Sequence, residues 1–188
     1  MGKKIKTDNS FLEEKVKLRL DNLPNKKTIQ VLDCFCGNRV IWNAIKAARP
    51  DTEFCIVGID IKKDGDGLYL VGDNLKYITG MDLSKFDIID IDAYGIPFKQ
   101  CEALFSNPTA KGKIVFATVI QSLYGCLPKK MLNVLGYTEK MIDKIPSLFN
   151  SNGIDKFLEY LSVRGVKQVK KYSDSSNRKN YLMFVLPE

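Results

Sequence analysis

A short apolar segment that runs into one glycine, and then into a helical pattern, constrains the fold most strongly. Ile29, Val31 and Leu32 are β-branched or bulky residues, typical of a strand buried on both faces. Asp33 marks the carboxyl end of this strand, and Gly37 provides the turn before the helix. In an open α/β sheet, a ligand binds outside the strand ends, where a glycine admits the backbone and a helix N-terminus offers N–H groups. The segment therefore predicts a ligand site above this turn.

The turn is not a complete dinucleotide-binding fingerprint. Phe35 and Arg39 stand where a glycine-rich loop would carry glycines, and only Gly37 lies between them. A single glycine also suits an ordinary connection between a strand and a helix. Both interpretations stay open at this point, and the residues downstream decide between them.

Strand and helix patterns alternate along the rest of the chain. A capping-box sequence at Ser10 predicts a first helix that stops at Pro24, and Trp42 belongs to the helix after the glycine turn. Trp42 is expected in the core, with a place in the wall of a ligand site as the alternative. Further strands are predicted at residues 54–59, 68–71, 86–92 and 113–118, a helical region at 128–161, and an antiparallel hairpin at 166–172 and 181–185. The alternation predicts an α/β fold with a mostly parallel sheet.

Length and composition fit one domain. The chain has 188 residues, of which 45% are hydrophobic, enough for one substantial core. Residues 1–9 are polar and basic and are expected to form a flexible N-terminus, so the predicted domain spans residues 10–188. The N-terminus lacks the apolar region of a signal peptide, and no run approaches a membrane span. We expect a cytoplasmic protein without a membrane partner.

The charge balance favours acidic partners. The chain has 29 Lys and Arg residues against 22 Asp and Glu residues, a formal net charge of +7. Such a balance favours nucleic acid as a partner, although lysines spread along the chain also suit a merely soluble surface. The pairs Lys26–Lys27 and Lys129–Lys130 are candidates for phosphate contacts, with a solvated surface as the alternative.

Cysteine and histidine usage narrows the chemistry. The five cysteines, at positions 34, 36, 55, 101 and 126, have spacings that fit neither a disulfide framework nor a zinc ribbon. They are expected to be reduced. The sequence contains no histidine, which excludes a histidine general base or triad, and we expect no metal site.

Acidic residues follow several predicted strands. Asp33, Asp60 and Asp92 end strands, and Asp73 follows Gly72 after the third strand. Because parallel strands share one carboxyl edge, carboxylates gathered there need cationic or hydrogen-bonding partners. Asp60 is suited to accept from both hydroxyls of a ribose, and Asp73 from an adenine amino group. Each acid alone also fits a helix N-cap or a turn, but their recurrence favours one common ligand.

These segments resemble the class I S-adenosylmethionine-dependent methyltransferases over most of the chain. Val31-Leu-Asp-Cys-Phe-Cys-Gly37 is similar to the first cofactor motif, Val57-Gly-Ile-Asp60 to the second and Gly72-Asp73 to the third. The resemblance implies a Rossmann-like three-layer sandwich on a seven-stranded, mostly parallel sheet with an antiparallel C-terminal hairpin strand. It also implies S-adenosyl-L-methionine as cofactor.

The same resemblance assigns parts of the cofactor to residues. Asp33 and Gly37 would face the methionine end, Asp60 the ribose and Asp73 the adenine. The neighbouring residues of the implied cofactor site are Phe35, Arg39, Ile61 and Asn74. Arg39 stands where the family usually has glycine, and its side chain would either pair with the cofactor carboxylate or obstruct the loop.

A fourth segment, residues 86–97, is similar to the Asp-Pro-Phe/Tyr-Gly-x-Pro motif of the tRNA guanine-N2 dimethyltransferases. By this resemblance Asp92 and the carbonyl of Ala93 would accept the hydrogens of an exocyclic amine, while Tyr94 would stack on the base. Pro97 closes the motif and, with Tyr94, belongs to the implied substrate site. Ala93 stands where the motif has proline, so the carbonyl is kept but the stiffness of the turn is lost.

The sequence thus predicts an enzyme that methylates a nitrogen, on a nucleobase in RNA or DNA. A rival hypothesis is an inactive protein of the same fold that binds the cofactor, nucleic acid or a protein partner, and Arg39 and Ala93 favour it. A nicotinamide-dependent oxidoreductase is the weakest alternative, because the glycine series is incomplete and no histidine is present for hydride transfer. The oligomeric state is left open.

Overall fold

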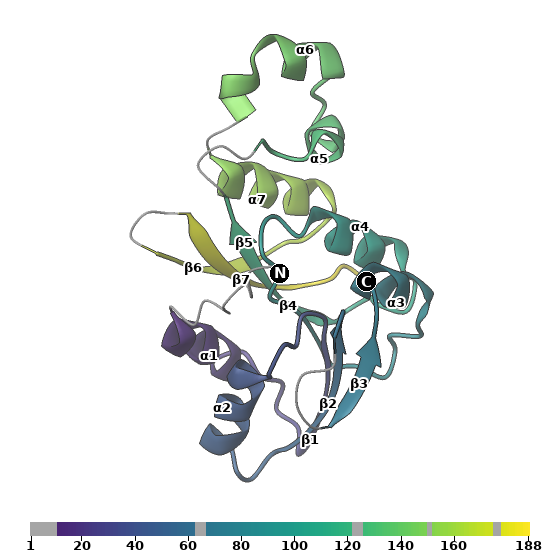
Figure 1. The fold of residues 1–188 in the computed structure, drawn as a ribbon, viewed down its shortest axis with the longest axis vertical. Helices are drawn as coiled ribbons and strands as arrows, with labels where there is room; N and C mark the ends of the chain where they lie inside the picture. Colours follow the sequence, from purple (N-terminus) through teal and green to yellow (C-terminus); the bar gives the residue numbers. More distant parts are fainter. Residues whose placement is uncertain (1–10, 63–66, 122–125, 150–151, 175–177) are drawn as a thin grey trace, which may run out of the picture.

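A seven-stranded sheet forms the centre of the protein, with the strand order β3-β2-β1-β4-β5-β7-β6 (Figure 1). The computed structural model describes residues 11–62, 67–121, 126–149, 152–174 and 178–188. The strands are β1 (Thr28–Asp33), β2 (Glu53–Asp60), β3 (Leu68–Val71), β4 (Ile88–Ile91), β5 (Ile114–Ile120), β6 (Val169–Ser173) and β7 (Lys179–Val185). Only the pairings of β7 with β5 and β6 are antiparallel. The predicted fold class is confirmed.

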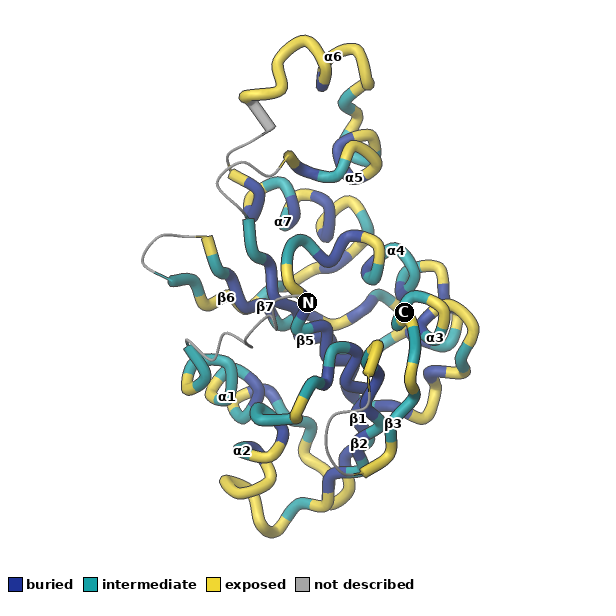
Figure 2. The backbone as a smooth tube through the Cα atoms, viewed as in Figure 1, coloured by how far each residue is buried: buried dark blue, intermediate teal, exposed yellow. Residues whose placement is uncertain are grey.

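Helices cover both faces of the sheet (Figure 1). The helices are α1 (Leu12–Leu20), α2 (Val40–Ala48), α3 (Asn74–Gly80), α4 (Phe98–Ser106), α5 (Lys129–Val134), α6 (Glu139–Lys144) and α7 (Gly153–Val163), with a 3₁₀ turn at Pro146–Phe149. α1 and α2 lie on one face, and α3, α4 and α7 on the other. α5 and α6 extend beyond the sheet, and most of α6 is exposed (Figure 2). The predicted helical region 128–161 is therefore divided into separate helices.

The alternation of side chains along the strands decides which residues share the α1–α2 face. Ile29 and Val31 of β1 and Ile88 of β4 pack in the core of that face, together with Trp42. Because side chains alternate between faces, the residue two positions beyond Val31, Asp33, points to the same face. By the same rule, Asp90 and Asp60 also point to it. The sheet thus gathers its terminal carboxylates under α1 and α2.

Two local features differ from the sequence expectations. α1 begins at Leu12 after Phe11, whose backbone is left-handed with φ of 64°, and the predicted capping Ser10 lies outside the described residues, as does the N-terminus 1–9. β2 and β3 pair in parallel although only residues 61–67 connect them. Parallel neighbours usually need a crossover of a dozen residues or more, commonly a helix, so this connection is unusually short.

Within the described part of the chain, no helix has the length and apolar character needed to cross a membrane.

Candidate functional site

A buried ion pair connects α1 to the strand that leads into the predicted site. Nε and Nη2 of Arg19 donate to the two carboxylate oxygens of Asp90, at 2.7 and 2.6 Å. The indole Nε1 of Trp42 donates to the same carboxylate at 2.9 Å. Trp42 is therefore a core residue that also donates a hydrogen bond to Asp90. Arg19 and Asp90 are each 1% exposed, and a buried charge of this kind is tolerated only with such partners.

Asp92, two residues further along, has its own cation. Nζ of Lys15 lies 2.8 Å from one carboxylate oxygen, and the hydroxyl of Thr118 donates to the other. Burial works to raise the pKa of Asp92, but the positive charges of Arg19 and Lys15 outweigh it and hold that pKa below its usual value. Asp92 is therefore an ionised acceptor. Each oxygen keeps a second lone pair beyond these contacts.

Asp33 is in the opposite situation. It lies beside Asp90 in the sheet register and is 5% exposed. Burial, followed by the negative charge of Asp90, raises the pKa of Asp33 well above its usual value, against the weaker influence of Arg19. A carboxyl group next to an ionised neighbour retains its proton more readily. The carboxyl groups at the ends of β1 and β4 thus differ in direction: the pKa of Asp33 is raised and that of Asp92 is lowered.

The glycine turn is attached to the tip of β2. The backbone N–H of Gly37 donates to Asp60 at 3.0 Å, and that of Ile61 donates to the other carboxylate oxygen at 2.7 Å. The Gly37 N–H is therefore engaged in this structure, although we expected it to be free for a ligand. Asp60 retains one lone pair on each oxygen. Beside it, the side chain of Ile61 is 77% exposed, which is unusual for an isoleucine and leaves an apolar surface next to the carboxylate.

Arg39 points to β3. Its guanidinium lies 4.1 Å from the centre of the Tyr69 ring, and Nη2 donates to the carbonyl of Leu68 at 2.5 Å. The absence of a side chain at Gly58 makes room for it, because a β-carbon there would lie 2.8 Å from Nη2. Arg39 thus packs against the short connection between β2 and β3, on the face where a crossover helix would otherwise lie. Neither of the two roles considered from the sequence is needed to explain this arginine.

The residues after β3 connect the site to the opposite helices. Asp73 caps α3 by accepting from the backbone N–H of Leu75 at 3.0 Å. The Asn74 amide donates to the carbonyl of Cys34 and accepts from Gln100, both at 3.2 Å. Asn74 therefore holds the end of β1 against α4. Asp73 is exposed at the same edge, and its role toward an adenine stays a prediction.

Two cavities flank the end of β1. A small one, about 60 Å³, has among its walls Lys15, Asp33, Gly37 and Asp92. A large one, about 970 Å³, lies on the other side of Phe35, which lines both. The walls of the large cavity include Phe35, Leu75, Thr79, Ala93, Tyr94, Ile96, Phe98, Lys99, Gln100, Glu102, Pro128, Lys129, Lys130 and Val134.

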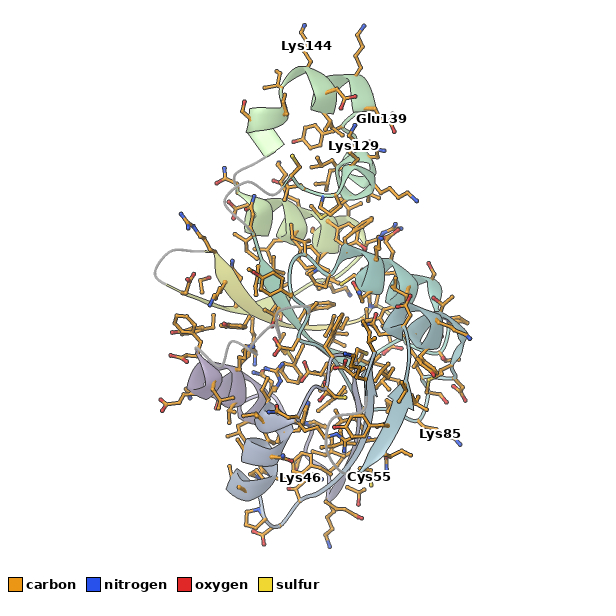
Figure 3. The ribbon with its side chains drawn as sticks, in the orientation of Figure 1. Lys46, Cys55, Lys85, Lys129, Glu139 and Lys144 are labelled. Carbon is orange, nitrogen blue, oxygen red and sulfur yellow. The ribbon has the colours of Figure 1, made fainter. Side chains whose placement is uncertain are left out.

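Of the predicted substrate residues, Tyr94, Lys129 and Lys130 line the large cavity, and Pro97 does not. The side chain of Tyr94 is 87% exposed at its rim, whereas Ala93 is buried. Pro97 is buried at the start of α4 and does not line this cavity. Lys129 is held by Asp143 at 2.6 Å, while Lys130 is exposed beside it. Lys144, at the C-terminal end of α6, points away from the sheet (Figure 3) and is not among the residues that line this cavity.

Three charged residues of the site, Lys15, Arg19 and Asp90, were not predicted from the sequence. Asp90 and Asp92 are two residues apart in a strand, and that spacing alone places them on one face. Lys15 and Arg19 are four apart on α1, so they lie on one side of the helix. Charged residues at this spacing usually face solvent, so only the packing of α1 against the sheet identifies them.

Solved structures of other proteins share the fold of this chain. No family model and no curated protein matches the chain. A SAM-dependent methyltransferase from Archaeoglobus fulgidus has 13% identity and a TM-score of 0.54, covering 93% of this chain and 94% of its own. The protein has a methyltransferase fold. The CurJ carbon methyltransferase (13% identity, TM-score 0.60) is covered over 56% of its length by 96% of this chain.

A third solved structure, Haemonchus contortus phosphoethanolamine N-methyltransferase 2 with S-adenosyl-L-methionine, has 11% identity and a TM-score of 0.60. It is covered over 53% of its length by 94% of this chain. The chain thus spans about half the length of two of these proteins and nearly all of the third. The methylated atoms named for these proteins differ, carbon in one and nitrogen in another, so the methyltransferase fold leaves the substrate undetermined.

Proposed function

We propose that this protein binds S-adenosyl-L-methionine across the carboxyl ends of β1, β2 and β3 and transfers its methyl group to the exocyclic amine of a nucleobase. The observation that carries the proposal is the convergence of the Gly37 turn, the Asp60 carboxylate and the ionised Asp92 at one sheet edge, where Gly37 and Asp92 line the small cavity. In open α/β sheets this edge is the usual ligand site.

The residues present fit the donor chemically. Asp60 keeps lone pairs for two ribose hydroxyls, and the exposed Ile61 beside it offers an apolar surface to a nucleobase. At the other end, Asp33 offers its carboxyl group to an ammonium group. When bound, the donor supplies an electrophilic methyl group on a positively charged sulfur.

The chain's own contribution is to orient the amine. An amine conjugated to a base is a weak nucleophile, so its reactivity depends on how its lone pair is positioned. Asp92 is ionised and can accept an amine hydrogen, and the Ala93 carbonyl is placed next to it in the chain. Tyr94, exposed at the rim of the large cavity, offers a ring for stacking on a planar base.

The walls and rim of the large cavity support a nucleic-acid substrate. Its lining combines apolar side chains with Lys99, Lys129 and Lys130, and the whole chain has a net charge of +7. A cationic rim around an apolar cavity suits a base attached to a phosphate backbone. Lys129 is paired with Asp143, so Lys130 is the stronger candidate for a phosphate contact.

The test is methyl incorporation from labelled S-adenosylmethionine into pools of RNA, DNA and protein. We expect label in a nucleic-acid pool, and we expect Asp92→Ala to abolish incorporation without weakening cofactor binding. Asp51→Ala serves as the control, since Asp51 is exposed in the turn before β2. Label in protein alone, or equal loss of binding and transfer in Asp92→Ala, would contradict the proposal.

The second candidate function is a protein that binds the cofactor without transfer. One observation favours it: both oxygens of Asp92 already accept from Lys15 and Thr118, so an amine must share or replace these donors. This candidate predicts cofactor binding with no incorporation into any pool.

A further inference from the structure

The cations around the small cavity differ in how firmly they are held. Arg19 uses Nε and Nη2 on Asp90 and Nη1 on the carbonyl of Lys15, and it is 1% exposed. Arg39 is directed to Tyr69 and Leu68. The Arg19 guanidinium is therefore fixed by a multidentate contact, whereas the Arg39 guanidinium is held beside β3 by one hydrogen bond and one ring contact.

Lys15 is held by weaker constraints. Its ammonium has one carboxylate contact, to Asp92, and its side chain is 12% exposed. It also lies 5.3 Å from the centre of the Tyr181 ring, a second group that attracts a cation. An ammonium group on a flexible four-carbon chain changes partner more easily than a guanidinium in a fork.

The small cavity explains why such a change is needed. Its volume is about 60 Å³, smaller than the cavity of about 150 Å³ that accepts a benzene molecule in a protein core. The amino-acid end of S-adenosylmethionine does not fit this space while its walls keep their places. Lys15 is a wall side chain with a flexible four-carbon chain and one hydrogen-bond acceptor, so its movement would enlarge the cavity without moving the backbone.

We propose that Lys15 is a switch that leaves Asp92 to bind the α-carboxylate of the methyl donor. This inference rests on the proposed function and adds a positioning residue to it. In the cavity walls, Asp33 offers an acceptor to the ammonium of an amino-acid ligand, while Asp90 is bound by Arg19 and Trp42. The ligand's carboxylate needs a cation. Of the two described cations in these walls, Arg39 is directed to Leu68 and Tyr69, whereas the Lys15 ammonium lies at Asp92.

The switch couples the two binding events. While Lys15 stays on Asp92, it competes with the substrate amine for one of the two carboxylate oxygens. Once the donor's carboxylate takes Lys15, one oxygen of Asp92 becomes available to an amine hydrogen. The donor therefore prepares the site for the substrate, which orders binding with the donor first.

The first test compares S-adenosylmethionine with its decarboxylated form, which keeps the sulfonium and the ammonium but lacks the carboxylate. Calorimetry on the wild-type protein is expected to show at least about tenfold weaker binding of the decarboxylated ligand. In Lys15→Met the two ligands should bind within about twofold of each other. Lys17→Met is the matched control, because Lys17 is on the same helix with its side chain 75% exposed, and it should keep the wild-type ratio.

The second test does not depend on a variant of Lys15. S-adenosylhomocysteine has an uncharged sulfur, so removing the charge of Asp92 does not weaken a sulfonium attraction. Asp92→Asn frees Lys15 in advance and should tighten S-adenosylhomocysteine binding severalfold. Unchanged or weaker binding of this ligand by Asp92→Asn would overturn the switch, as would undiminished discrimination in a folded Lys15→Met protein.

Failure of the proposed function gives a different result. If the wild-type protein binds neither S-adenosylmethionine nor S-adenosylhomocysteine, the cofactor assignment itself is wrong and the switch falls with it. If both bind but Lys15→Met still discriminates, the cofactor assignment stands and only the switch is overturned.

Discussion

Arg19 of α1 and Asp90 of β4 form a two-point ion pair although 71 residues separate them in the chain. The pair fixes the first helix over the carboxyl end of the sheet, directly beside Asp92. It therefore positions Lys15, one helical turn before Arg19, at the candidate site.

Arg19→Met is expected to lower the free energy of unfolding by about 3–5 kcal/mol, because it leaves Asp90 buried without its cation. Urea unfolding followed by circular dichroism measures this change. Lys17→Met, on the exposed side of α1, should stay within about 0.5 kcal/mol of wild type. A loss below about 1 kcal/mol for Arg19→Met would mean that the ion pair does not fix α1.

Asp33 predicts a stability change with pH of a definite sign. Its folded-state pKa lies above the unfolded value, which is about 3.9. Above about pH 4 the folded state therefore holds more protons than the unfolded state, and stability falls as pH rises until the folded pKa is reached. Asp33→Asn removes this fall, so the variant should gain stability relative to wild type between pH 5 and pH 8.

Asp92 acts in a separate pH range. Its folded pKa is lowered, so its contribution to stability is present above about pH 4 and is lost as pH falls from there toward the folded pKa. Thermal melts of wild type and Asp33→Asn from about pH 3 to pH 8 separate the two groups, because the Asp92 contribution changes below about pH 4 and the Asp33 contribution changes above it. A stability difference that does not change between pH 5 and pH 8 would contradict the raised pKa of Asp33.

Much of the fold follows from residue pattern, because apolar strands and helical stripes recur with regular spacing. Gathering Asp33, Asp60 and Asp92 at one edge also follows, since parallel strands end on the same side. The cations that compensate two of the strand-end acids were not predictable. Lys15 and Arg19 look like solvated helix residues until α1 is packed on the sheet, and helix packing depends on contacts distant in sequence.

The role of Arg39 also depends on contacts that are distant in sequence. In the sequence, Arg39 stands where the resembling family usually has glycine. In the structure, its guanidinium packs on the Tyr69 ring and has space beside Gly58. The reason lies in the short connection between β2 and β3, which is far from the glycine turn in sequence.

Arg39→Met is therefore expected to lower stability by about 1–2 kcal/mol, through the lost ring contact and hydrogen bond. The net loss is small because Nε of Arg39 is buried without a hydrogen-bond partner among the described residues. S-adenosylhomocysteine affinity should change less than threefold by calorimetry. A tenfold or larger loss of affinity would instead assign the ligand's carboxylate to Arg39.

Thiol labelling tests whether the turn region is closed. Cys126 is exposed, while Cys34, Cys36 and Cys101 are buried, and burial raises the pKa of Cys36 to about 11. Iodoacetamide at pH 7.5 should modify Cys126 first, as located by peptide mass spectrometry, and Cys126→Ser should remove the fast phase. Fast modification of Cys34 or Cys36 in the native protein would show that the glycine turn opens readily.

The central claim is that the Gly37 turn and the Asp60 carboxylate together bind a nucleoside-bearing methyl donor. Calorimetric titration of the wild-type protein and of Asp60→Ala with S-adenosylhomocysteine tests it most directly. We predict one site per chain in the wild type and at least about tenfold weaker binding in a folded Asp60→Ala variant. No measurable binding to the wild type, or equal affinity in both proteins, would contradict it.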